Sequence, residues 1–207
     1  MREYPTIELP IIRETPVYIF DKLDGSNIRA EWRPKRGFYK YGKRHALINE
    51  KDEEFGETIK LINDRYSEKL NRMFREKKWE QALCFFEYHG SHSFAGSHRR
   101  DEEKTVTLIE LNRDKKGIVP PSEFLKLAAD YELEIPSVLY YGKITDEIVE
   151  QIKTGTMPGM TYEGVVCKAD KNISPGLPIM FKIKNRNWID TLKIYCDNNH
   201  DLYKRLL

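Results

Sequence analysis

The sequence predicts a mixed α+β fold with largely antiparallel sheets, and two patterns carry this prediction. Short apolar or alternating segments of strand length recur along the chain, and longer segments repeat their apolar residues every three or four positions. No internal repeat, low-complexity tract or linker divides the sequence. We therefore expect a single domain over residues 1–207, long enough to bury a substantial core.

The predicted strands are spread over most of the chain. Val17–Phe20 is a short apolar run, Ile28–Trp32 alternates, and the turn-rich stretch between them should continue neither strand. A strand-like stretch follows and leads to Lys43. Four later runs are also strand-like: Ala82–Tyr88, Thr105–Leu111, Tyr162–Lys168 and Ile179–Lys184.

Helical spacing occurs in the intervening segments. Between Glu53 and about Lys78 it predicts a long amphipathic helix with the core-facing residues Phe55, Ile59, Ile62, Tyr66, Leu70 and Met73. A second helix is predicted over Glu123–Tyr131 with Ser122 as its N-cap, and a shorter one begins at Thr145. The 23 residues after Lys184 should be partly helical.

Composition argues against a membrane protein. The chain has 40% hydrophobic and 33% charged residues with a mean hydropathy of −0.66, and no apolar run approaches the roughly 18 residues of a membrane span. No signal peptide is evident. The cysteines form no C-x-x-C pair and should be buried free thiols: Cys84, Cys167 and Cys196. We expect a cytoplasmic protein without a membrane partner, in the host cytoplasm if a phage encodes it.

The net charge of +2 does not by itself indicate a nucleic-acid partner. Basic residues nevertheless cluster at Arg33–Arg36, Lys43–Arg44, Arg99–Arg100 and Lys182–Arg186. These clusters could form a phosphate-binding footprint on one face, or they could be solvated surface. Taken alone, they favour solvated surface.

The stretch Lys22–Asn27, KLDGSN, is the most informative chemical signal. A lysine attacks phosphorus only as the neutral amine, so a site that uses one must lower its pKa by desolvation or nearby positive charge. Lys22 directly follows a predicted buried strand, and Gly25 would let the backbone approach a ligand closely. A hairpin turn with an exposed lysine explains the stretch equally well.

Further segments follow in an order that resembles the covalent nucleotidyltransferases, the superfamily of polynucleotide ligases and mRNA capping enzymes. The matches are Lys22–Gly25 (motif I, K-x-D-G), Lys43–Arg44 (Ia), Phe85–Gly90 (III), Glu163–Val166 (IV) and Lys182–Lys184 (V, K-x-K). One such match alone is uninformative, but five in order span most of the chain. The resemblance implies an ATP-grasp-like adenylation domain, with antiparallel sheets flanked by helices.

The resemblance also implies chemical roles. Lys22 would take AMP from ATP, while Lys182 and Lys184 would neutralise the triphosphate and lower the pKa of Lys22. Glu163 would hold Mg²⁺ or Mn²⁺, directly or through water. Glu87 would accept hydrogen bonds from the ribose.

Other positions are implied to touch the nucleotide or the nucleic acid. Asp24 and Gly25 complete the nucleotide-binding motif I. Arg44 offers a guanidinium fork to the nucleotide or to a 5′-phosphate end. Asn27 extends motif I as it does in phage nick-sealing RNA ligases, and it would touch the nucleic acid.

One position departs from the pattern of the superfamily, which places an aromatic residue against the base. Here Ile109 takes that place, with Val166 expected on the opposite side of the base. Aliphatic packing stacks less strongly than an aromatic ring, so the preference for adenine over guanine is left open.

The segment after motif III contains His89, His92 and His98, but their spacing matches no common zinc pattern. A polar loop is the favoured interpretation. This loop also carries Arg99 and Arg100, which could meet nucleic acid or simply be solvated.

The short segment after motif V favours an RNA ligase without an OB-fold. Such an enzyme would join 5′-phosphate and 3′-hydroxyl RNA ends through a lysyl-AMP and an adenylylated 5′ end. A protein partner could supply a missing C-terminal domain. The alternatives are a minimal ATP-dependent DNA nick ligase, since DNA strands are also conceivable substrates, and a degenerate domain that binds nucleotide or RNA without catalysis.

Overall fold

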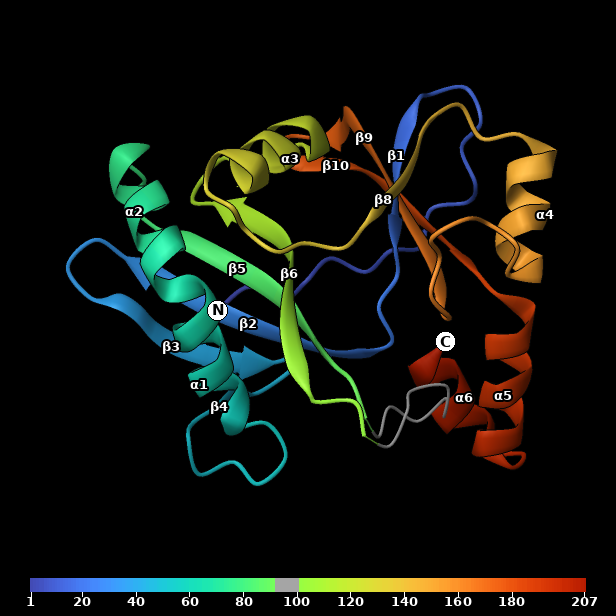
Figure 1. The fold of residues 1–207 in the computed structure, drawn as a ribbon, viewed down its shortest axis with the longest axis horizontal. Helices are drawn as coiled ribbons and strands as arrows, with labels where there is room; N and C mark the ends of the chain where they lie inside the picture. The colour runs from blue at the N-terminus through green and yellow to red at the C-terminus, as the bar shows by residue number, and fades with distance from the viewer. Residues whose placement is uncertain (92–100) are drawn as a thin grey trace.

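The computed structural model describes residues 1–91 and 101–207, and these residues form two sheets with antiparallel pairing throughout (Figure 1). The six-stranded sheet has the order β4-β3-β2-β5-β6-β7, formed by Leu47–Ile48, Gly37–Lys43, Gly25–Arg33, Ala82–His89, Thr105–Arg113 and Gly117–Ile118. The four-stranded sheet has the order β10-β9-β1-β8, formed by Leu177–Lys184, Gly164–Ser174, Val17–Asp21 and Val138–Gly142. The predicted mixed fold with antiparallel sheets is thus confirmed.

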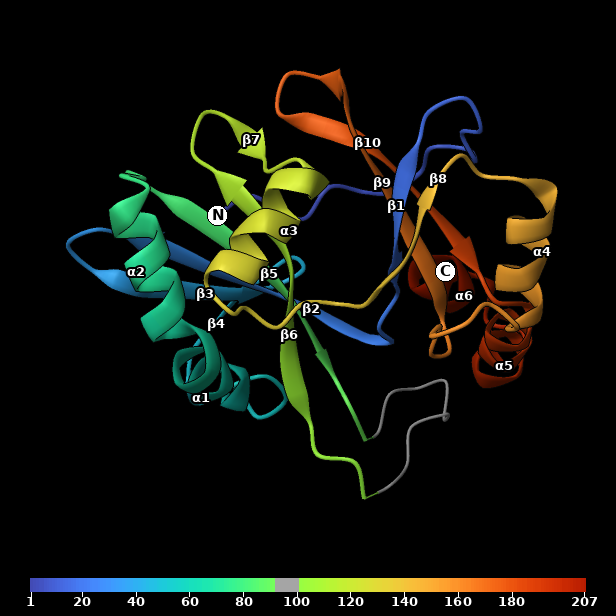
Figure 2. The same ribbon diagram turned by 45° about the horizontal axis from the view of Figure 1, so that its top comes forward.

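Helices cover the two sheets separately (Figure 2). Against the six-stranded sheet lie α1 (Glu57–Ile62), a π-helical segment η1 (Asn63–Ser67), α2 (Glu68–Glu76) and α3 (Pro121–Asp130). Beside the four-stranded sheet lie α4 (Asp146–Thr154), α5 (Arg186–Cys196) and α6 (His200–Leu206). All six residues of the predicted apolar stripe in the first helical region are buried in the core of the larger sheet.

The structure corrects the predicted helix and strand boundaries in three places. Ser122 does not cap α3: the helix begins at Pro121, and the Ser122 N–H is instead bonded to the Asp170 carboxylate at 2.9 Å. Strand β2 begins at Gly25, so half of the predicted turn is strand. Edge strand β8 was not predicted. Thr145 caps α4 as expected.

The three cysteines, Cys84, Cys167 and Cys196, are buried free thiols, as predicted. Among the described residues, no helix is both long and apolar enough for a membrane span.

The N-terminal segment has no regular structure before β1, yet it is fixed to the larger sheet. The guanidinium of Arg29, on β2, donates hydrogen bonds to the carbonyls of Met1 and Arg2 at 3.3 and 2.8 Å, and to that of Lys43. The ring of Tyr4 packs edge-on against Phe85, with centroids 5.0 Å apart. This segment therefore forms a wall beside the sheet.

Candidate active site

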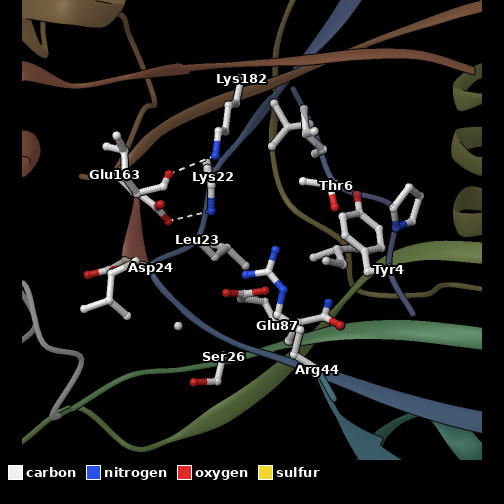
Figure 3. A pocket seen from close by; sticks show the side chains of 18 of the residues that line it. Tyr4, Thr6, Lys22, Leu23, Asp24, Ser26, Arg44, Glu87, Glu163 and Lys182 are labelled. Carbon is white, nitrogen blue, oxygen red and sulfur yellow. Dashed lines mark hydrogen bonds and ion pairs between the residues drawn. The ribbon is translucent and has the colours of Figure 1, made fainter. Parts of the chain in front are cut away.

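A cavity of about 610 Å³ lies where the two sheets meet (Figure 3). Its lining comes from the β1–β2 connection, from strands of both sheets, from the N-terminal segment and from the C-terminal residues. It collects all predicted nucleotide-site residues: Lys22, Asp24, Gly25, Arg44, Glu87, Ile109, Glu163, Val166, Lys182 and Lys184. Residues from six separate parts of the sequence thus face one space.

Lys22 is held at the junction of three adjacent strands. It follows the end of β1, and its N–H donates to the Gly164 carbonyl at 3.0 Å. Its Nζ donates to Oε2 of Glu163 at 2.7 Å, while Lys184, at the end of β10, donates to Oε1 of the same carboxylate. Because β1 and β10 both pair with β9, the strand order brings the two lysines onto the residue that precedes β9.

Two glycines permit this close approach. A Cβ on Gly25 would lie 2.1 Å from the carbonyl oxygen of Tyr88 on the neighbouring strand. A Cβ on Gly164 would lie 2.2 Å from the carbonyl oxygen of Ile183, and Gly164 has a φ of +135° that other residues rarely adopt. The glycines of motifs I and IV are therefore needed for strand packing around the site.

The pKa of Lys22 was expected to be lowered by Lys182 and Lys184, and the structure corrects this expectation. Burial lowers the pKa of its amine, but the negative charges of Glu163 and Glu87 and the bond to Glu163 outweigh burial, so the pKa lies above the usual lysine value. The basic neighbours therefore do not depress the pKa of Lys22 in the free protein.

The pKa is lowered instead in the other two lysines of the site, Lys182 and Lys184. Burial, partly opposed by Glu163, lowers the pKa of Lys184 to about 8. Burial and the charge of Lys22 lower the pKa of Lys182. The Nζ of Lys182 lies 2.8 Å from the carbonyl oxygen of Leu207, and that of Lys184 lies 3.6 Å from the centroid of the Trp188 ring.

Glu87 projects into the cavity from β5. Burial raises its pKa to about 8 despite the opposing charge of Lys22, so the carboxyl is largely protonated at neutral pH. Asn27 pairs with Glu87 across the β2–β5 ladder and lies on the same face. The Nδ2 of Asn27 donates weakly to the Phe86 carbonyl at 3.5 Å, and its buried Oδ1 has no hydrogen-bond partner among the described residues.

The predicted base-binding pair, Ile109 and Val166, lines the cavity from two different sheets. Ile109 sits at a β-bulge: Phe85 pairs with Glu110 while Phe86 pairs with Leu108, which leaves Ile109 without an opposite residue. Such bulges re-aim side chains at functional sites.

Two contacts that sequence reasoning missed stabilise this region. The hydroxyl of Tyr66, in the π-helical segment, accepts from the N–H of Leu108 at 3.2 Å and lies 3.0 Å from the Glu134 carbonyl. The Nζ of Lys168, on β9, donates to Glu110 at 2.6 Å and to the Ile109 carbonyl at 2.9 Å. This buried ion pair joins the two sheets behind the cavity.

The residues predicted to contact nucleic acid are distributed unevenly. Arg44 is exposed at the cavity wall, and Asn27 lies deeper. Arg99, Arg100, His92 and His98 lie outside the described residues.

No metal centre made only of protein ligands is found within residues 1–91 and 101–207. The Nε2 of His89 lies 2.8 Å from the Thr107 hydroxyl. His89 is the one member of the histidine-rich segment that lies within the described residues.

Comparison with known proteins agrees with this geometry. The family profile described as RNA ligase matches residues 15–186, which include every motif named above. The chain belongs to the RNA ligase family. Among curated proteins, none matches its sequence.

Solved structures share the fold of this RNA ligase family member. An RNA ligase from Naegleria gruberi is 12% identical with a TM-score of 0.65, over 88% of this chain and 52% of its own. A variant of the same enzyme, solved with ATP and Mn, is 13% identical with a TM-score of 0.60, over 86% and 51%. A protein from Aquifex aeolicus, named as an ATP-dependent DNA ligase, is 18% identical with a TM-score of 0.68, over 100% and 57%. The chain therefore spans about half the length of these structures.

Proposed function

We propose that residues 1–207 are the adenylyltransferase domain of an ATP-dependent RNA ligase that joins 5′-phosphate and 3′-hydroxyl ends. The observation that carries this proposal is the single carboxylate of Glu163 shared by Lys22 and Lys184 at one end of the cavity. The Naegleria structures with ATP and Mn support the same class of nucleotide for this chain.

In the first step the Nζ of Lys22 attacks the α-phosphorus of ATP. An N–P bond forms, the bond from that phosphorus to the bridging oxygen breaks, and pyrophosphate leaves. The amine must lose its protons in this step, so its contact with the Glu163 carboxylate at 2.7 Å, which favours the ammonium form, must first be relieved. Lys182 and Lys184 would neutralise the phosphate charge.

The AMP then passes from Lys22 to the oxygen of a 5′-phosphate, and the N–P bond breaks. A 3′-hydroxyl attacks the activated phosphorus and expels AMP, which closes the strand. Positioning and charge neutralisation are the protein's contribution to each step.

The donor set fits a divalent cation held mainly by phosphates. Both oxygens of Glu163 contact lysines, and the described residues offer no cluster of three or more ligating side chains. Mg²⁺ or Mn²⁺ would therefore take Glu163, water and phosphate oxygens, and would supply charge neutralisation at the triphosphate.

At the other end of the cavity, Glu87 would bond the ribose hydroxyls, and Ile109 and Val166 would enclose the base. Asn27 and Arg44 would contact the strand ends. The Oδ1 of Asn27, which has no hydrogen-bond partner within residues 1–91 and 101–207, supports a polar ligand at that point.

Incubation with α-labelled ATP and Mg²⁺, followed by denaturing electrophoresis, tests the nucleophile. We expect an acid-labile labelled band in the wild type and in Lys143→Ala, an exposed control, and none in Lys22→Ala. A wild type without label, or a band that survives in Lys22→Ala, contradicts the proposal.

The second candidate function is DNA nick sealing, favoured by the likeness to the Aquifex aeolicus protein. Matched nicked duplexes with an RNA or a DNA strand at the 3′-hydroxyl side separate the two functions. Faster sealing of the RNA strand supports RNA ligation, and faster sealing of the DNA strand supports the alternative. Label on Lys22 without any sealing would indicate a domain that only binds and activates nucleotide.

A further inference from the structure

A second charged surface lies at the opposite end of the larger sheet from Lys22. We call it the basic end, and define it as residues 33–40, 75–81 and 113–116. Strand β2 leads from Gly25 at the cavity to Arg33 at the basic end, and its nine residues span about 26 Å at the usual strand rise.

The three segments of the basic end lie side by side, at the left of the molecule in Figure 1. Arg75, near the end of α2, donates to the Pro34 carbonyl at 3.2 Å, and Arg33 donates to Oε1 of Gln81 at 3.0 Å. The guanidinium of Arg113 lies 5.3 Å from the centroid of the Trp79 ring. These segments lie up to 80 residues apart in the sequence, and their charges come together only when the chain folds.

The formal charge of the basic end is large. It contains three acidic residues, Glu76, Glu80 and Asp114, and ten basic ones: Arg33, Lys35, Arg36, Lys40, Arg75, Lys77, Lys78, Arg113, Lys115 and Lys116. Its formal charge is thus +7 in a chain whose total is +2. Within the described residues, none of the ten makes an ion pair with a carboxylate.

Three cations of the basic end lie around the ring of Tyr39. The ring of Tyr39 has Arg33, Arg36 and Lys40 at 5.9, 5.2 and 6.0 Å from its centroid. Its hydroxyl donates to buried Glu31, which places the ring in a fixed position. The three cations therefore lie around one ring whose position is fixed, instead of being spread over the turn.

The basic end and the cavity share one face of the sheet. Asn27, Arg29 and Glu31 alternate along β2 and point to the same side, away from the helices. Asn27 lines the cavity, Arg29 binds the N-terminal segment, and Glu31 holds Tyr39. The N-terminal segment crosses this face at Arg29, so a long ligand that leaves the cavity would pass over that segment to reach the basic end.

We propose that the basic end binds the phosphate backbone of an RNA duplex whose reacting end lies at Lys22. This proposal rests on the proposed ligase function and adds to it a second contact with the substrate. Unpaired cations around an aromatic ring match a polyanion, and a duplex that runs from Lys22 along this side of the molecule would bring its phosphates to them. The contact carries no sequence information, because it is made to phosphate.

The test variant is Lys35→Glu/Arg36→Glu, in the exposed turn between β2 and β3. The control is Lys60→Glu/Lys143→Glu, which makes the same charge change on exposed residues outside the basic end. Binding of nicked RNA duplexes, with arms of about 12 or about 4 base pairs, is measured without ATP by fluorescence anisotropy from about 50 to 200 mM salt. Label transfer from ATP to Lys22 is measured separately, without RNA.

We expect the test variant to bind the long-armed duplex roughly tenfold or more weakly than the wild type, with a salt slope reduced by about 2. The control should bind like the wild type, and the short-armed duplex should not distinguish the three proteins. Labelling of Lys22 should be unchanged in all of them.

Equal losses in the test and control variants, equal losses on both duplexes, or no loss at all would each overturn the proposal. No loss would assign the basic end to some other acidic partner, such as a protein. Failure of the proposed function is a different result: the wild type would then take no label on Lys22, while the binding measurement stays readable.

Discussion

The carboxyl of Glu87 offers a quantitative test of the cavity's electrostatics through the variant Glu87→Gln. Burial raises the pKa of this group to about 8, from an ordinary value near 4.5 in the unfolded chain. The folded state therefore retains a proton that the unfolded state has lost. Stability from the neutral carboxyl is fully present below about pH 4.5 and is lost as the pH rises through 8.

The size of this loss follows from linkage. Each pH unit between the two pKa values costs about 1.4 kcal/mol, so the interval from pH 5.5 to 7.5 costs the wild type about 2.7 kcal/mol relative to Glu87→Gln. Glutamine keeps the shape of the neutral acid but cannot ionise, and the variant should therefore be the more stable protein at pH 8.

Urea unfolding of both proteins at pH 5.5, 6.5 and 7.5 measures the effect. The difference between the two free energies of unfolding isolates Glu87 from the other titrating groups. A difference that stays constant within about 0.5 kcal/mol across this range would show that Glu87 is not held neutral, and the reasoning would fail. Under the proposed function, ribose hydroxyls that donate to this group would favour its ionised form, so nucleotide binding should release a proton.

Four further variants test the rest of the site. Lys168→Met should cost about 3–5 kcal/mol in urea unfolding because it leaves Glu110 buried without its partner, and Lys168→Met/Glu110→Leu should recover most of that loss. Ile109→Phe should strengthen ATP binding in calorimetry by about 0.5–1.5 kcal/mol through stacking, and unchanged affinity would place the base elsewhere. Gly164→Ala should lower the free energy of unfolding by at least about 1–3 kcal/mol, since its Cβ would meet the carbonyl of Ile183; normal stability would contradict the packing argument.

The sequence was most informative where chemistry requires particular residue types in a particular order. Lys22, Glu87, Glu163 and the lysines of β10 were singled out because their motifs occur in the order of the superfamily that the sequence resembles, and all of them line one cavity. Their convergence depends on the pairing order of β1, β9 and β10, which no local pattern specifies.

Other features of the site could be predicted from the sequence only in part or not at all. Lys168 and Glu110 each follow an apolar run within a strand, and charged residues in such places are usually paired when buried, but the sequence does not say which residue pairs with which. The bulge at Ile109 depends on the register between β5 and β6, and register is a tertiary property. The N-terminal segment has no periodicity, so its place in the cavity wall could not be predicted; Arg29 fixes it there.

The contact that positions Lys22 also opposes its reaction. At 2.7 Å from Glu163 the ammonium form is favoured, and the pKa of Lys22 is raised when a nucleophile needs it lowered. Lys184 shares that carboxylate, and its own pKa is lowered to about 8, so it is the less firmly charged partner. If phosphate oxygens drew Lys184 away from Glu163, Lys22 would be the only lysine bound to that carboxylate. The pKa of Lys22 would then rise further. We therefore infer that nucleotide binding alone does not activate Lys22, and that Glu163 must exchange its lysine partners for another cation before the amine can attack.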